Sequence, residues 1–419
     1  MSTVTRSVAR NINVIYLMGF FHSFMVLIPV LVPLLQGYGL SMTQVLQTQA
    51  LFALTIAVCE VPSGYIADLW GRRGAIIVGS LINAVGCLLL LWADTFIEFL
   101  VYEFLLGVGV SLISGADLAL LYDSELYLSE HGLDGGAGAS KSLSRLISIE
   151  AGASGIAGIV ASVLLIWSLD AVVWLQAFTG LAPLLLGFVL LELPRPASSG
   201  HRDNARRIVD LLLFSRPVVL CIAVALVVFG LFSLYVFWVY QKYWEIQQIP
   251  LENFGYIWAA YALTVSAAAH GASWLEHKLG VQRFLVLIIA LPVAGLLGMT
   301  LGNGWWGVLF GLAVQVGRGL SVTVFYEALN RRVPGDFRAT VNSLVSLGVR
   351  GVFIITGPVL GYALDNAGIT NTLLGLLLVF APLMVLTVSV LLTQLRRESA
   401  AAEPVAIINE QPVIVGGSG

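Results

Sequence analysis

The chain reads Gly64-Tyr65-Ile66-Ala67-Asp68-Leu69-Trp70-Gly71-Arg72-Arg73 between two apolar runs that are each long enough to cross a lipid bilayer. Three charged residues, Asp68, Arg72 and Arg73, therefore fall where a membrane protein would leave the bilayer. Lys and Arg concentrate in the cytoplasmic loops of membrane proteins. The stretch predicts a tight cytoplasmic turn between two membrane-spanning helices.

Composition supports a membrane location for most of the chain. Of its 419 residues, 58% are hydrophobic and 11% are charged, whereas soluble domains carry roughly 45–50% apolar and about 25% charged residues. The mean hydropathy is +0.92. We therefore expect an integral membrane protein with the lipid bilayer as its main surroundings.

Other classes of partner find little support in the sequence. The 21 basic and 24 acidic residues form no basic patch, so nucleic acid is not an expected partner. Cys59, Cys87 and Cys221 lie in apolar runs and match no metal-ligand spacing, which makes them small core residues. We expect neither a metal nor a cofactor. With no metal-ligand cluster and no plausible catalytic set away from lipid, we do not expect an enzyme.

Apolar runs of about 20 residues, the length that crosses a bilayer core, recur along the chain. They predict an all-α membrane protein of twelve helices at 12–36, 43–66, 74–93, 97–122, 144–168, 171–192, 213–240, 253–273, 283–302, 305–327, 341–363 and 371–394. All but three of the 21 Lys and Arg residues fall on one side of this arrangement. The excess of basic residues predicts that both termini are cytoplasmic.

The chain divides into two halves that resemble repeats. The predicted units are an N-terminal six-helix bundle, a cytoplasmic linker, a C-terminal six-helix bundle and a tail, at residues 1–192, 193–212, 213–395 and 396–419. The loop Glu276–Arg283 is a weaker copy of the opening stretch, half a chain later. Such parallel repeats are related by an axis along the membrane normal.

The spacing of the opening stretch, Gly64, Asp68, Gly71, Arg72 and Arg73, resembles the loop between helices 2 and 3 of the major facilitator superfamily of transporters, G-x-x-x-D-x-x-G-R-R/K. An ordinary cytoplasmic turn would account for the two arginines, but less well for the acid and the glycines. The resemblance implies a solute carrier that works by alternating access, with this loop as part of a conformational latch.

The resemblance also implies partners for the latch. Asp68 would face the N-terminal end of helix 11, where the helix dipole favours a carboxylate. Arg72 would reach Asp123, which ends helix 4 in Ala119-Leu120-Leu121-Tyr122-Asp123. These contacts would hold the cytoplasmic side closed in the outward-open state.

Ionisable residues inside the predicted helices are candidates for proton or substrate coupling, because each costs several kcal/mol in lipid unless it is paired, hydrated or neutralised. Arg350 lies in helix 11 at nearly the position that Glu150 has in helix 5, so an acid and a base could pair across a central cavity. A static buried ion pair is the alternative. The four candidates are Glu60, Asp117, Glu150 and Arg350. Arg318 in helix 10 could instead brace that helix against its neighbours.

Two further groups could line the cavity. Helix 7 ends in an aromatic segment whose deeper members, Phe237, Trp238, Tyr240 and Gln241, would suit an amphipathic or aromatic solute. An interfacial aromatic belt is the alternative. His22 in helix 1 could also line the cavity, although a lone histidine on an apolar helix is more often packed.

Glu60-Val61-Pro62-Ser63-Gly64 together with the end of helix 4 resembles the drug-efflux branch of the superfamily, although helix 5 lacks the proline of that branch's signature. We therefore expect a monomeric, multi-pass protein of a bacterial inner membrane that exports a small molecule by proton antiport. A proton symporter that imports a nutrient, metabolite or siderophore is the first alternative. A non-transporting sensor or assembly factor is the second.

The latch hypothesis makes a direct prediction. We expect Asp68→Asn to lower transport while leaving membrane insertion intact, because the amide loses the charge that a helix N-terminus favours. Transport in vesicles, together with labelling of the cytoplasmic side, measures the effect. Normal transport with unchanged accessibility of that side would contradict the hypothesis.

Overall fold

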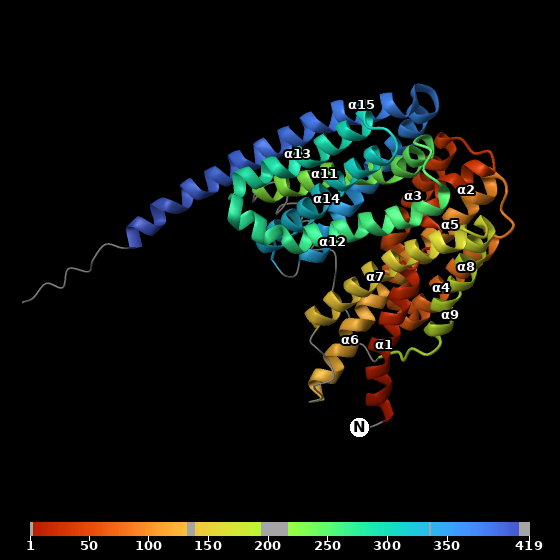
Figure 1. Cartoon of the computed structure of the whole chain (residues 1–419). Helices are drawn as coiled ribbons and strands as arrows, with labels where there is room; N and C mark the ends of the chain where they lie inside the picture. Colours follow the sequence, from red (N-terminus) through yellow and green to blue (C-terminus); the bar gives the residue numbers. More distant parts are fainter. Residues whose placement is uncertain (1–2, 132–138, 194–216, 335–336, 410–419) are drawn as a thin grey trace, which may run out of the picture.

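The computed structural model describes the chain except for residues 1–2, 132–138, 194–216, 335–336 and 410–419. The described residues form helices, and no strand occurs among them. Figure 1 shows two groups of helices that follow each other along the chain. The predicted linker 193–212 lies almost entirely outside the described residues, and its bounds remain a prediction.

The first group, here called the first bundle, packs helices of the N-terminal half against one another. Its elements are α1 (Thr3–Ser23), η1 (Ile28–Val30), α2 (Leu31–Gly37), α3 (Met42–Trp70), α4 (Arg72–Leu89), α5 (Phe96–Ile113), α6 (Ala116–Glu130), α7 (Ala139–Leu165), α8 (Leu169–Thr179) and α9 (Ala182–Gly187).

The second bundle contains longer, less interrupted helices. Its elements are α11 (Pro217–Ile246), η3 (Leu251–Asn253), α12 (Phe254–Leu279), α13 (Val281–Leu301), α14 (Trp305–Arg332) and α15 (Arg338–Asn409). Gly368 interrupts α15 with a non-helical backbone conformation (φ 77°, ψ 171°), which glycine adopts without strain. Figure 1 shows α15 turning back on itself.

Ten helical stretches among the described residues are long and apolar enough to cross a bilayer. They confirm the expected multi-pass, all-helical membrane protein. The helix α12, which covers the predicted span 253–273, is not among the ten, and the stretch 340–398 is counted once despite the interruption at Gly368. The count of twelve and the cytoplasmic location of the termini therefore stay predictions.

Local sequence explains where the helices begin and end. Ser41 starts α3 with a capping box, in which its hydroxyl accepts the Gln44 backbone N–H at 3.2 Å. Thr95 does the same for α5 with Glu98. Exposed tryptophans stand at or beside helix ends, as expected for side chains at a membrane–water interface: Trp70, Trp92, Trp167, Trp305 and Trp306.

Two predicted helices are divided in the structure. The predicted helix 12–36 becomes α1, η1 and α2, with Pro29 and Pro33 in the later pieces, because proline cannot donate the backbone hydrogen bond that continues a helix. The predicted helix 97–122 becomes α5 and α6, and the chain turns at Ser114 and Gly115. This break puts Asp117 in the first turn of α6.

The two bundles touch mainly where α3 packs along α15 and α7 packs along α12. Specific contacts between them gather at one end of the molecule, which we call the junction end, at residues 28–43, 158–162, 241–256 and 361–365. Figure 1 shows that the bundles diverge from there toward the end where the N-terminus lies. We call that other end the basic end, because Arg10, Arg72 and Arg73 lie there.

Small residues bring the bundles to backbone contact at the junction end. A Cβ atom on Gly255 of α12 would lie 1.9 Å from the carbonyl oxygen of Gly158 on α7, so no larger residue fits without movement. Beside it, the backbone N–H of Tyr256 donates to the Ser162 hydroxyl at 2.9 Å. Such small-residue contacts are a common way for membrane helices to approach closely.

A carboxylate of the second bundle caps a helix of the first. Asp365 accepts the backbone N–H groups of Met42 at 2.9 Å and Thr43 at 2.8 Å, and the Thr43 hydroxyl at 2.6 Å. These amides belong to the first turn of α3, where unpaired donors and the helix dipole favour an anion. Gly361, one turn earlier in α15, packs against the Met42 backbone.

These contacts predict that Gly255→Val opens the junction end. Inserting methyl groups into a packed contact costs about 1–3 kcal/mol, which would lower the population of the closed junction about 5- to 150-fold. The rate of disulfide formation between Thr43→Cys and Asp365→Cys, in a chain without the native cysteines, measures that population. Gly271→Val on the same helix is the matched control, because nothing lies within 4 Å of a Cβ there. Equal rates in both variants would contradict the prediction.

Candidate functional site

A cavity of about 360 Å³ lies in the second bundle between α11, α14 and α15. Aromatic and aliphatic side chains form most of its wall, including Phe229, Phe237 and Phe325. Two guanidinium side chains, Arg318 and Arg350, also line it. Its volume is within the range of small-molecule sites, which are mostly apolar with a few polar groups that fix orientation.

One of these arginines joins the two bundles. The Nη1 atom of Arg350 lies 3.6 Å from Oε2 of Glu60 on α3, and both side chains are partly exposed. The sequence indicated Glu150 as the acid at the matching position, but the structure pairs Arg350 with Glu60. The reason is tertiary: α3 packs along α15, whereas α7 packs along α12.

The other two predicted acids face the interior of the first bundle. Asp117 accepts the backbone N–H of Leu118 at 2.6 Å, and its carboxyl group lies near enough to Glu150 for the two charges to interact. Glu150 lies close to Gly19 of α1: a Cβ atom on Gly19 would be 3.4 Å from Oε1 of Glu150. His22 lies one turn further along α1 and is half-buried.

The aromatic end of α11 serves two different purposes. Phe237 lines the cavity and packs edge-on against Trp238 and Trp258. Trp238 and Tyr240 are buried, and Tyr240 packs against neighbouring aromatic rings. Neither lines the cavity, so of these aromatic residues only Phe237 is placed to touch a bound solute there.

Gln241, predicted to line the cavity, instead bridges the bundles at the junction end. Its Oε1 atom accepts the Val32 backbone N–H, and its Nε2 atom donates to the Ile28 carbonyl, both at 2.9 Å. The side chain is fully buried. The amide thus satisfies one backbone group in η1 and one in the first turn of α2, where the break in the helix leaves helical hydrogen bonds missing.

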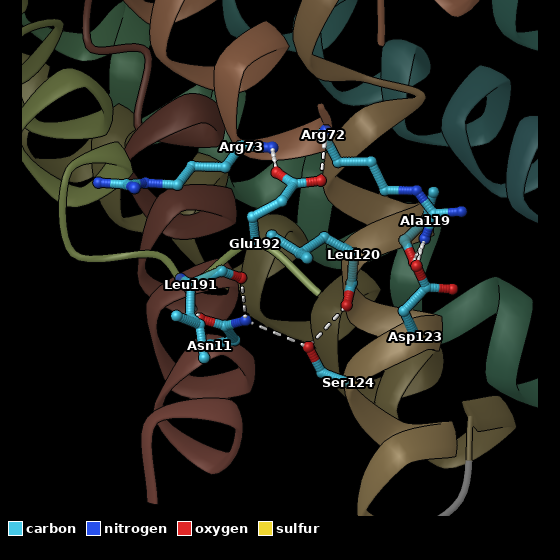
Figure 2. Close-up of polar contacts among 9 residues, drawn as sticks. All are labelled: Asn11, Arg72, Arg73, Ala119, Leu120, Asp123, Ser124, Leu191 and Glu192. Carbon is cyan, nitrogen blue, oxygen red and sulfur yellow. Dashed lines mark hydrogen bonds and ion pairs between the residues drawn. The ribbon is translucent and has the colours of Figure 1, made fainter. Parts of the chain in front are cut away.

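At the basic end, the opening stretch forms a compact cluster (Figure 2). The Arg72 guanidinium forms an ion pair with Asp123 and donates to the Ala119 carbonyl. Both belong to α6, so the pair ties α4 to α6 within the first bundle. The predicted contact is present, while its role in a latch remains a prediction.

Glu192 is the unforeseen member of this cluster. Its carboxylate accepts the backbone N–H groups of Arg72 at 3.0 Å and Arg73 at 2.7 Å, which are the first amides of α4 (Figure 2). Gly71 makes room for it: the glycine has a φ of 94°, and a Cβ atom there would lie 3.0 Å from the carboxylate. The requirement for glycine at this position is therefore both conformational and steric.

Asn11 is the second residue that sequence reasoning missed. Its side chain exchanges two hydrogen bonds of 2.9 Å with the backbone of Leu191 and donates to Ser124 at 3.4 Å (Figure 2). It is fully buried. A polar residue at the start of a long apolar run, and an acid just before Pro194, were the available signals, but neither specifies a partner.

Two residues of the opening stretch, Asp68 and Gly64, and the weaker copy of the stretch differ from this pattern. The side chain of Asp68 lies outside the described residues, so its predicted contact with helix 11 stays a prediction. Gly64 is exposed, and among the described side chains none lies within 4 Å of a Cβ there. In the weaker copy, Gly280 joins α12 to α13 with a φ of 76°, much as Gly71 joins α3 to α4, but no atom approaches it as Glu192 approaches Gly71.

Two helical bundles in succession along the chain, with ionisable side chains at membrane depth, are typical of secondary transporters. The chain belongs to the Major Facilitator Superfamily, whose family model matches residues 14–358. It is therefore a membrane transporter rather than an enzyme. No curated protein matches it by sequence.

Solved structures of transporters share the fold at low sequence identity. The nucleoside transporter NupG is 12% identical over 94% of this chain and 99% of its own, with a TM-score of 0.70. A bacterial homologue of the human lysosomal transporter Spinster, inward-facing and occupied, is 14% identical over 94% and 98%, with a TM-score of 0.72. A peptide transporter, POT, in complex with sulfate is 14% identical over 91% and 95%, with a TM-score of 0.67.

The basic-end cluster predicts a measurable interaction between Arg72 and Asp123. Because both side chains are partly exposed (22% and 32%), we expect a coupling free energy of about 0.2–1 kcal/mol that falls with added salt. A double-mutant cycle of Arg72→Gln and Asp123→Asn, followed by thermal unfolding, measures it. The more exposed pair Arg331–Glu327 is the control. A coupling no larger than that of the control, with no salt dependence, would contradict a structural role.

Proposed function

We propose that the chain is a proton-coupled secondary transporter of a small amphipathic molecule, with its solute site in the cavity between α11, α14 and α15. The observation that carries this proposal is the ion pair between Glu60 and Arg350, because it joins the two bundles beside that cavity. A proton on Glu60 would remove its charge and release Arg350. Proton binding and the contact between the bundles are thereby linked.

The bundles would move relative to each other by alternating access. Contacts at the junction end and divergence toward the basic end support a state that is closed on one side of the membrane and open on the other. With both termini in the cytoplasm, as the distribution of Lys and Arg indicates, this state would be open to the cytoplasm. The proposed contact of Asp68 with helix 11 would then form only in the opposite state.

Export of the solute by proton antiport is the first candidate for the direction of transport. It is supported by the resemblance of Glu60–Gly64 and Ala119–Asp123 to drug-efflux transporters. We place the protein in the inner membrane of a bacterium, as a monomer. Asp117 and Glu150 are further candidates for the proton site, since their carboxyl groups interact with each other inside the first bundle.

Import by proton symport is the second candidate, and one observation favours it. A solute carboxylate that took Arg350 away from Glu60 would leave that acid without its cation, and Glu60 would then bind a proton. Solute and proton would therefore bind together. The two candidates differ in the direction in which protons move when solute is added to inverted membrane vesicles.

The coupling proposal predicts different behaviour for the three candidate coupling acids and for an exposed acid elsewhere in the first bundle. In vesicles screened with a solute panel, we expect Glu60→Gln to lower pH-driven transport about tenfold, a typical loss when a coupling free energy is removed. If Asp117 or Glu150 carries the proton, Asp117→Asn or Glu150→Gln should weaken the dependence of transport on the proton gradient. Asp170→Asn, at an exposed acid in the first turn of α8, is the control. Full proton dependence in all three variants of the candidate coupling acids would overturn the assignment.

A further inference from the structure

Arg318 has an unusual environment for a charged side chain at membrane depth. It lies in the middle of α14, lines the cavity and is half-buried. Within the part of the chain that the structure describes, its guanidinium forms neither an ion pair nor a hydrogen bond. The guanidinium keeps its charge in proteins, so the cost of burial cannot be avoided by losing a proton.

The charge balance of the cavity is positive. Arg350 shares its charge with Glu60 at 3.6 Å, a distance longer than a direct charge-assisted hydrogen bond. No carboxylate offsets Arg318 among the described residues. A bound anion would supply the missing charge, and a planar guanidinium is well suited to grip a carboxylate with two parallel hydrogen bonds.

The other residues that line the cavity indicate the chemistry of the part of the ligand that does not contact the arginines. Phe229, Phe237 and Phe325 give the cavity apolar and aromatic surface, while Ser233 and Ser346 add small polar groups. Apart from the two arginines, the wall has no charged side chain. It would therefore hold an uncharged apolar body while Arg318 holds the charge. A cationic solute would meet two positive charges and lose its hydration, which costs several kcal/mol without a partner.

We propose that the cavity binds an amphipathic organic anion, with its carboxylate on Arg318 and its apolar or aromatic part against the phenylalanine side chains. This inference rests on the proposed function and narrows the solute class. Arg318 thereby becomes a binding residue, instead of a brace between α14 and its neighbours.

The test uses the purified full chain and three probes of one shape: naphthoate, the neutral naphthamide and the cationic naphthylmethylammonium. We expect naphthoate alone to raise the unfolding temperature, by an amount that grows with the logarithm of its concentration above the Kd, because a ligand that binds only the folded state stabilises it. Arg318→Gln should weaken naphthoate binding by at least about tenfold, the loss expected for a hydrogen bond to a charged group. Arg318→Lys, which keeps the charge, should lose less.

Arg331→Gln is the matched control, since Arg331 is an exposed arginine of the same helix that pairs with Glu327. Stabilisation by the amide or the ammonium equal to that by naphthoate would overturn the proposal. Undiminished naphthoate binding in Arg318→Gln would also overturn it. If chloride raised the unfolding temperature as much as naphthoate does, the cavity would bind an inorganic anion, and the proposal would be wrong. Proton-driven transport of an uncharged solute by the unsubstituted chain, without transport of naphthoate, would overturn the anion site and leave the transport proposal standing.

Discussion

The backbone contact between Gly158 and Gly255 sets the geometry on which the rest of the molecule depends. Helices that meet at backbone distance cannot approach further, so the two bundles are held at the junction end and diverge from it. Asp365 strengthens the same place, since it caps α3 from the opposite bundle. The divergence in turn leaves the middle of the molecule to be bridged by long side chains, and there Arg350 reaches Glu60.

The second constraint is the cost of charge inside a membrane. Ionisable residues at bilayer depth persist where they face protein or water rather than lipid, and this chain follows that rule in two ways. Asp117 and Glu150 lie near enough within the first bundle for their charges to interact, whereas Arg318 and Arg350 line a cavity in the second. The acids and the bases are thus separated by bundle, and Glu60 with Arg350 joins the two sets. A relative movement of the bundles would change that contact first.

Sequence was a good guide to features that are local or periodic. Long apolar runs predicted the membrane helices, and the resemblance of the opening stretch to the superfamily's loop predicted the contact between Arg72 and Asp123. Partners from separate helices were harder to predict. Glu60 rather than Glu150 meets Arg350 because of which helices pack together, and Gln241 turns to backbone groups that a broken helix leaves unpaired. Asn11 and Glu192 bind backbone atoms, which have no signature in the sequence.

The two ends of the molecule differ in what their contacts join, and this difference bears on how the transporter can move. At the basic end, Arg72, Asn11 and Glu192 connect α1, α4, α6 and the segment after α9, all within the first bundle. Such contacts keep that bundle rigid whichever side of the membrane is open. At the junction end the contacts cross between bundles and consist of small-residue packing and of hydrogen bonds, each of which contributes only about 1–3 kcal/mol. A transporter that alternates between two states requires this difference. Each bundle must keep its own structure, while the contacts between the bundles must be weak enough to break and re-form. Because a single ion pair at partial exposure is also weak, Glu60 and Arg350 can take part in the exchange without locking either state.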